Sequence, residues 1–282
     1  MRPLKESTRS MKLTNRFAAT AAVLLMMLPL SGCNRLKSRD ALNRGIQAFK
    51  NNQYEVAENY FQKAINLDPS YDQARLYLAT AYAYQVVPQM TDEKNMALAN
   101  KAIAGFKEVL AKDPKDKVAL QQIASIYRNI KMIKEAKEYE LKVIALDPTD
   151  AEAHYTIGVI DWAEAYKNAT EELAKDGKTD KGDGNPGMSK ATCAKIKELN
   201  SDIVEDGLTH LQKAIDINPN YDDAMSYLNL VYRRQADFAC GNDAARKESI
   251  AKADEWSQRS MGARKANEKK KEEKASHGVV TQ

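Results

Sequence analysis

A short phrase, aspartate or asparagine followed by proline, closes successive stretches in which apolar residues recur with helical spacing. Its prolines are Pro69, Pro114, Pro148 and Pro219, and the interval from Pro114 to Pro148 is 34 residues. The first interval is 11 residues longer. The last spans either two repeats plus three residues or one repeat with a 37-residue insertion. We favour the insertion, because no second proline closes a helical stretch between them. A recurring period of this length predicts stacked helical repeats.

Small and bulky residues recur at matching distances before these prolines. Small residues allow two helices to approach closely, bulky ones fill the space beside them, and the proline ends the second helix. We therefore expect the tyrosines of this set to pack in the core. The set comprises Gly45, Ala57, Phe61 and Ala64; Leu78, Ala79, Tyr82, Ala102 and Phe106; Leu120, Ile123, Ala124, Tyr127, Ala136 and Val143; and Ile157, Gly158 and Ala214.

This pattern resembles the tetratricopeptide repeat (TPR), a 34-residue helix–turn–helix unit. The resemblance covers residues 38–260. It implies an all-α fold, a right-handed solenoid of helical hairpins with about five repeats and an insertion in the fourth. The family's early tryptophan is missing from every repeat, and the fifth, with Leu228 and Tyr232 on its first helix, has no closing proline. The glycine-rich segment 176–187 predicts a mobile surface loop between two long helices.

The N-terminal segment has the pattern of an export signal. Basic residues up to Arg16 precede the uncharged stretch 17–30, which is too short to span a bilayer as a helix. The stretch ends in Leu30-Ser31-Gly32-Cys33, which resembles the bacterial lipobox. That resemblance implies that residues 1–32 are removed, that Cys33 is lipidated, and that residues 33–37 form a linker. Either Met1 or Met11 can serve as the start.

Charge and motif patterns exclude several classes of function. Residues 1–32 hold five basic side chains and one acid, so the rest of the chain, with 38 basic and 38 acidic residues, lacks the surplus typical of nucleic-acid binders. Asp176, Asp180 and Asp183 do not have the ligand spacing of an EF-hand. The histidines do not have zinc-site spacing, and no nucleophile motif stands out. We expect no metal, no cofactor, no small-molecule substrate and no enzymatic activity; the alternative is an enzyme or an accessory subunit of an envelope hydrolase.

The two cysteines beyond Cys33 suit a disulfide in an exported protein. Cys193 lies about 25 residues before the expected turn at Asn218–Tyr221 and Cys240 about 20 after it. At about 1.5 Å per residue, the two lie at similar heights along an antiparallel helix pair. We therefore predict a Cys193–Cys240 bridge that clamps the insertion. The residues from 261 to 282 are strongly charged, and we expect them to form a disordered tail.

In the TPR family the first helix of each repeat lines a concave groove, and this resemblance implies a partner-binding surface. The expected groove combines aromatic rings, amides and guanidinium groups, which suit an extended peptide or a helix. The predicted groove residues are Leu76, Tyr77, Tyr84, Gln121, Gln122, Ser125, Arg128, Asn129, Tyr155, Trp162, Tyr227, Arg233 and Arg234.

Together these patterns predict an adaptor that binds protein or peptide partners and is tethered to a membrane by a lipid anchor. The lipobox places it in the bacterial envelope, facing the periplasm. The residue after the cysteine is Asn34 rather than aspartate, which by resemblance to enterobacterial sorting favours the outer membrane.

Cys33 is expected to carry the anchor, because it is the cysteine of the lipobox pattern. Two or three acyl chains on this residue would hold the protein stably on a bilayer. Labelled palmitate should enter the wild-type protein and should not enter Cys33→Ala. Equal incorporation into both proteins would contradict this prediction.

Overall fold

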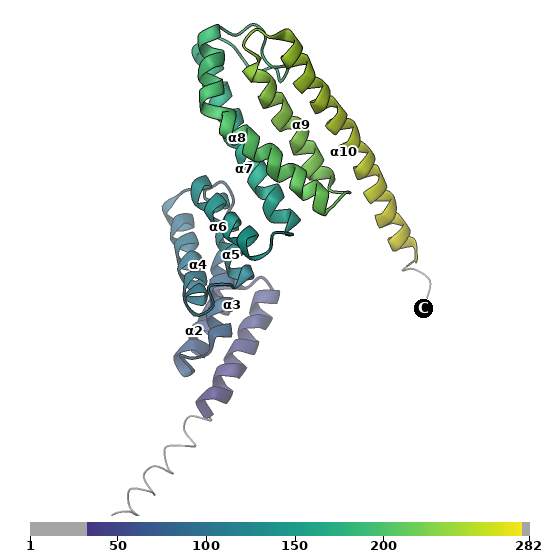
Figure 1. Ribbon diagram of the computed structural model, residues 1–282. Coiled ribbons are helices and arrows are strands. Elements are labelled where there is room, and N and C mark those ends of the chain that lie inside the picture. Colours follow the sequence, from purple (N-terminus) through teal and green to yellow (C-terminus); the bar gives the residue numbers. More distant parts are fainter. Residues whose placement is uncertain (1–32, 278–282) are drawn as a thin grey trace, which may run out of the picture. The chain divides into compact units, whose positions relative to one another are not determined.

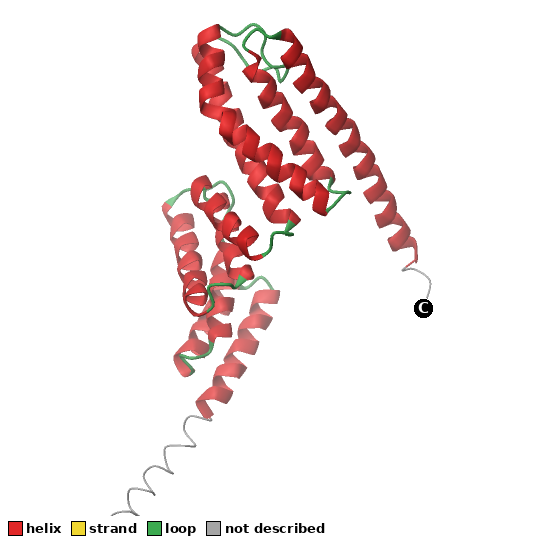
Figure 2. Cartoon of the chain, in the orientation of Figure 1, coloured by secondary structure: helices red, strands yellow, loops and turns green. Residues whose placement is uncertain are grey.

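The computed structural model describes residues 33–277, and within them the regular structure is helical, with no strand (Figures 1 and 2). The predicted signal peptide, residues 1–32, lies outside the described residues. A first helix covers residues 33–50. The helices that follow are α2 (Tyr54–Leu67), α3 (Asp72–Ala83), α4 (Glu93–Lys112), α5 (Lys117–Asn129), α6 (Ile133–Leu146), α7 (Ala151–Lys175), α8 (Lys190–Ile217), α9 (Asp222–Ala236) and α10 (Asp243–His277), with a 3₁₀ turn at Asp237–Ala239.

In sequence order these helices form five successive helix–turn–helix units, and the fourth carries the insertion between α7 and α8. The predicted all-α repeat fold is therefore confirmed. The chain divides into two compact units, Met1–Lys131 and Met132–Gln282. Unit 1 contains the helix over residues 33–50 and α2 to α5, and unit 2 contains α6 to α10. No helix among residues 33–277 is long and apolar enough to cross a membrane.

Unit 1 is held together where small residues meet large ones. A Cβ atom added at Gly45 would lie 2.4 Å from the ring of Phe61, and one added at Gly105 would lie 2.7 Å from the Cβ of Ala79. Such distances leave no room for a side chain, so each glycine marks a close approach of two helices. Phe61 is fully buried, and Tyr77 stacks on it with ring centroids 5.5 Å apart.

The long turn between α3 and α4 is organised by one buried amide. Asn95 donates from Nδ2 to the carbonyls of Val87, at 3.0 Å, and Met90, at 2.7 Å, and its Oδ1 accepts from the Val87 N–H. Asp92 caps α4 by accepting from two backbone N–H groups. The interval from Pro69 to Pro114 is 11 residues longer than the repeat, and these bonds satisfy backbone groups of the longer turn.

Unit 2 also has a glycine at a close contact between two helices, and its helices are longer. A Cβ atom added at Gly158 of α7 would lie 2.3 Å from Leu211 Cγ of α8. The core cluster that includes Leu211, Leu228 and Trp256 joins α8, α9 and α10. In Figure 1, α10 runs beside α9 and extends beyond it.

The segment 176–187, which its glycine content predicted to be a mobile surface loop, makes specific contacts with side chains of unit 2. Asn185 is buried and donates from Nδ2 to both Asp180 and Asp237. The carbonyls of Gly182 and Asp183 accept from Arg233 and Arg246 at 2.8 and 2.9 Å. The loop is therefore attached to α9 and α10 by side chains that lie some 50 residues away in sequence.

Two predictions about the ends of the solenoid, a linker at residues 33–37 and a disordered tail from residue 261, are wrong for the residues that the structure describes. Residues 33–37 are helical rather than a linker, and α10 continues to His277 instead of ending near residue 260. Arg264 explains part of the second difference, because it binds Asp222 at 2.9 Å and Asp223 at 3.3 Å at the start of α9. Asn267 adds a bond to the carbonyl of Asn220.

Gly158→Ala should destabilise unit 2 by about 2 kcal/mol or more, because the added methyl group overlaps a fully buried leucine. The matched control is Gly262→Ala in α10, where nothing lies within 4 Å of an added Cβ. There the higher helix propensity of alanine should stabilise the helix by about 0.5–1 kcal/mol. Urea unfolding of both variants measures the difference, and similar midpoints would contradict it.

Candidate functional site

Five aromatic rings from α7 and the start of α9 form one continuous surface in unit 2, which we call the aromatic surface: Tyr155, Trp162, Tyr166, Tyr221 and Tyr227. Trp162 lies at the centre, stacked on Tyr166 at 5.5 Å and edge-on to Tyr227 at 5.3 Å. Tyr155 contacts Tyr227 and Tyr221 at 5.7 and 5.0 Å. The spacing of Tyr155, Trp162 and Tyr166 along α7 puts them on one helix face.

Each ring of this surface is packed on one side and open on another. Tyr155, Trp162, Tyr221 and Tyr227 are half-buried against the core cluster, and Tyr166 is 42% exposed. Burial raises the pKa of Tyr221, and so does the hydrogen bond that its hydroxyl donates to Glu152. Tyr221 therefore stays protonated and neutral, as a binding surface requires.

The arrangement suits recognition rather than chemistry. Tyrosine and tryptophan present large apolar areas at low cost in side-chain entropy, and their polar atoms can pair with a partner. Among the surface residues there is no nucleophile with an adjacent base. Three of the rings, Tyr155, Trp162 and Tyr227, were predicted from the repeat frame. Tyr166 and Tyr221 were missed, although Tyr166 could have been found from its position four residues after Trp162.

In unit 1, some of the groove residues predicted on or next to α3 are half-buried and one is exposed. Tyr77 is half-buried on Phe61, and Leu76 is half-buried beside Arg75. Tyr84, just after α3, is 62% exposed and lies edge-on to Phe49 at 4.9 Å. Tyr84 is therefore the open aromatic group of this unit.

The predicted groove residues of α5 are half-buried and share one face of the helix, since their positions differ by one, four, seven and eight. The backbone carbonyl of Asn129 accepts from the N–H of Gln89 at 2.8 Å. These residues are Gln121, Gln122, Ser125, Arg128 and Asn129.

Two predicted groove residues have structural roles instead, which corrects the sequence interpretation. Arg234 is only 2% exposed, and its guanidinium group binds Asp180 at 2.9 Å and Asp237 at 3.1 Å. Burial raises the pKa of Asp237 to about 6, although Arg234 acts in the opposite direction. Arg233 donates to the carbonyl of Gly182 at 2.8 Å and to Asp254. Both arginines anchor the insertion.

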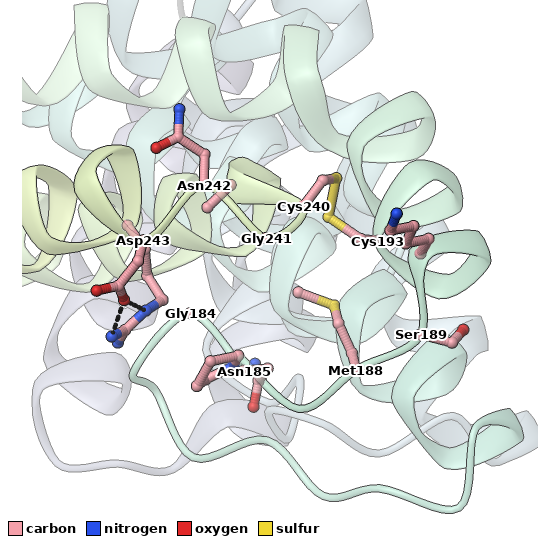
Figure 3. A pocket seen from close by; sticks show the side chains of 13 residues that line it. Gly184, Asn185, Met188, Ser189, Cys193, Cys240, Gly241, Asn242 and Asp243 are labelled. Carbon is pink, nitrogen blue, oxygen red and sulfur yellow. Dashed lines mark hydrogen bonds and ion pairs between the residues drawn. A yellow bond between two sulfur atoms is a disulfide. The ribbon is translucent and has the colours of Figure 1, made fainter.

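Cys193 and Cys240 are joined in a disulfide with Cα atoms 5.4 Å apart, the pairing that the sequence predicted. The bridge links the first turns of α8 to the segment before α10 and lines a cavity of about 300 Å³. Figure 3 shows Met188 beside the bridge. Asp243, which also lines the cavity, accepts a hydrogen bond from Arg246. In a chain-entropy model a bridge that closes a loop of this length stabilises the fold by about 4 kcal/mol. Oxidation of the pair in the exported protein stays a prediction.

An ionic cluster around one buried carboxylate connects α6, α7 and α8. Lys137 contacts Asp161, which is 1% exposed, and Asp206, at 2.7 Å. Burial raises the pKa of Asp161 to about 7, against the effect of Lys137. Burial opposes the charge on Lys137, but its two carboxylate partners outweigh burial and raise its pKa. This cluster fixes the register of the three helices.

Two histidines that lie 56 residues apart in sequence meet beside this cluster. The Nδ1 atoms of His154 and His210 are 2.8 Å apart, and His154 Nε2 lies 3.3 Å from the carbonyl of Pro148. Because that carbonyl only accepts, His154 carries its proton on Nε2, and its Nδ1 accepts from His210. Burial lowers the pKa of both rings. This contact was not predicted from the sequence, since the two residues belong to different helices.

Among the described residues, no three His, Cys, Asp or Glu side chains are placed so that they could hold a metal ion. The described site consists of packed rings, anchored arginines and an ionic cluster.

The molecule is thus a helical-repeat protein, and its exposed aromatic rings lie on the first helices of its helix–turn–helix repeats. Two segments match family models of the tetratricopeptide repeat, residues 39–71 and 118–150. No curated protein matches the chain by sequence. Solved structures share the fold: a MamA protein is 15% identical, with a TM-score of 0.55 over 83% of this chain and 94% of its own.

A second MamA, from Desulfovibrio magneticus RS-1, is 17% identical, with a TM-score of 0.53 over 82% of this chain and 96% of its own. The chain therefore contains tetratricopeptide repeats at these two segments and shares its helical-repeat fold with these solved structures. A TPR fold supports binding of protein or peptide partners, in the manner of an adaptor. Proteins of this class are typically non-enzymatic scaffolds.

The histidine pair should make unit 2 less stable as the pH falls from about 7 to about 5. Its folded-state pKa values are lowered, so the unfolded chain takes up protons first, below the ordinary value of 6.5. A proton on His154 Nδ1 would also set two N–H groups face to face. The melting temperature of the wild type, relative to His154→Gln/His210→Gln, should fall over this range. A difference in melting temperature that stays constant with pH would contradict the prediction. Asp161 acts in the opposite direction, but it is present in both proteins, so its effect cancels in the difference.

Proposed function

We propose that this protein is a membrane-tethered TPR adaptor of the bacterial envelope, which holds a protein partner on its aromatic surface. The observation that carries the proposal is the partly exposed set of contacting rings on α7 and at the start of α9, centred on Trp162. Contacting aromatic residues on a rigid helix pair offer area without the entropy cost of ordering a loop.

The tether is the second part of the proposal and rests on Leu30-Ser31-Gly32-Cys33. Cys33 is exposed and is not part of the disulfide. Acylation of this residue after export would place the protein on a membrane facing the periplasm, and Asn34 favours the outer membrane. An assembly or scaffold role in the envelope fits an adaptor held in this way.

The neutral balance of the chain beyond residue 32 supports protein partners over nucleic acid. The same balance argues that apolar and aromatic contacts, more than long-range charge attraction, provide the affinity. Exposed ion pairs contribute only about 0–1 kcal/mol each, whereas a buried aromatic anchor contributes about 2 kcal/mol or more.

Trp162→Ala should weaken a partner captured from envelope extract about thirtyfold, the equivalent of about 2 kcal/mol. The matched control is Trp256→Ala, which removes the other tryptophan of the same core cluster but lies outside the aromatic surface. Affinity is measured on the purified partner, and folding by circular dichroism.

The control separates binding from stability, because both tryptophans pack on the same cluster. Equal loss of affinity in both variants would mean that the effect is structural. In that case Tyr166→Ala, which removes a 42% exposed ring, decides the question. A folded Tyr166→Ala and a folded Trp162→Ala that both bind as the wild type does would overturn the aromatic surface as the partner site.

A further inference from the structure

The anchor residue already belongs to the folded part of the chain. Cys33 lies in the helix described over residues 33–50, and Ser38 is fully buried, with its hydroxyl donating to the carbonyl of Ala64 at 2.8 Å. Ala41 and Leu42 follow in the core of unit 1. Five helical residues rise about 7.5 Å, so the first packed residue lies less than about 10 Å from Cys33.

The outer face of these first turns has an unusual composition. Leu36 is 72% exposed, the most exposed large apolar side chain among the described residues. Cys33 and Leu36 are three residues apart and therefore share a helix face, opposite the buried Ser38 and Leu42. Arg35 and Lys37 flank Leu36, and Arg39 follows one turn later; all three are exposed.

The charge on this segment is positive. Residues 33–44 hold four basic side chains and one acid, Asp40, which pairs with Arg44 at 3.0 Å. Arg35 is 3.7 Å from Asp68 but keeps 72% of its side chain exposed. Basic residues next to a lipid anchor are attracted to anionic headgroups, and an exposed leucine can enter the interface between headgroups and acyl chains.

We propose that the first two turns of this helix, with Cys33, Leu36, Arg35, Lys37 and Arg39, form a contact surface for an anionic phospholipid leaflet. The proposal rests on lipidation of Cys33, as in the proposed function, and adds that no flexible tether separates unit 1 from the bilayer. Unit 1 is then held at the headgroups by acyl chains, one leucine and a basic flank together.

A photoreactive diazirine amino acid at position 36 of the full-length lipidated protein tests the contact. The protein is reconstituted in vesicles of phosphatidylethanolamine and phosphatidylglycerol, irradiated, and searched for lipid adducts by mass spectrometry. The matched control is position 84, because Tyr84 is 62% exposed in the same unit and contacts Phe49, about 20 Å along the helix from Leu36. Adducts at 36 and none at 84 are expected. Equal yields at the two positions, or no adduct at 36, would overturn the proposal.

The role of charge is tested by Arg35→Gln/Lys37→Gln, which should reduce the adduct at position 36 about fivefold or more in these vesicles, since each basic residue near an anionic surface is worth about a factor of five. Lys94→Gln/Lys131→Gln, two exposed lysines elsewhere in unit 1, should leave it unchanged. An unchanged yield in the first variant would overturn the charged part of the surface.

Palmitate labelling of the same samples separates this proposal from the proposed function. Labelled protein without an adduct at position 36 contradicts the contact surface and leaves the anchor intact. Unlabelled protein contradicts the anchor, and the contact surface fails with it.

Discussion

The close approach of paired helices at small residues is the constraint on which the rest of this structure depends. The ring of Phe61 packs against Gly45, and the side chain of Leu211 packs against Gly158. Both contacts are too close to leave room for a Cβ atom on the glycine. Such contacts bring the two helices of a hairpin near enough for dispersion forces to act along their length. One hairpin still leaves an apolar face open, so the next must cover it, and the chain becomes a row of repeats.

The first helices of the hairpins then carry the surfaces that a partner can reach. In unit 2 four of the five rings on the aromatic surface pack against the core and stay partly open. The rings of Trp162, Tyr227 and Tyr155 pack on the core and on each other. In the proposed function, a surface positioned in this way would lose little further entropy when a partner binds.

The insertion in the fourth repeat is stabilised by a different kind of interaction. Its backbone carbonyls and Asp180 are bound by Arg233, Arg234 and Arg246, and the disulfide adds a covalent link. Buried charges are expensive unless they are paired and hydrogen-bonded, and here each arginine has an acid or a carbonyl as its partner. The loop thus forms part of the end of unit 2 and does not move freely over it.

The repeat period, the helical class, the glycine and phenylalanine positions of the hairpins and the pairing of Cys193 with Cys240 could all be predicted from the amino-acid sequence. These follow from local rules: small residues, proline stops and helical rise act within one hairpin or two. Which arginines face a groove could be known only from the packing of the helices. Arg234 has the spacing of a surface residue, but Asp180 from the insertion buries it.

The same holds for His154 with His210 and for the burial of Ser38 in the helix that contains Cys33. Each depends on a partner distant in the chain, whose position is set by packing between helices and not by the spacing of residues along any one of them.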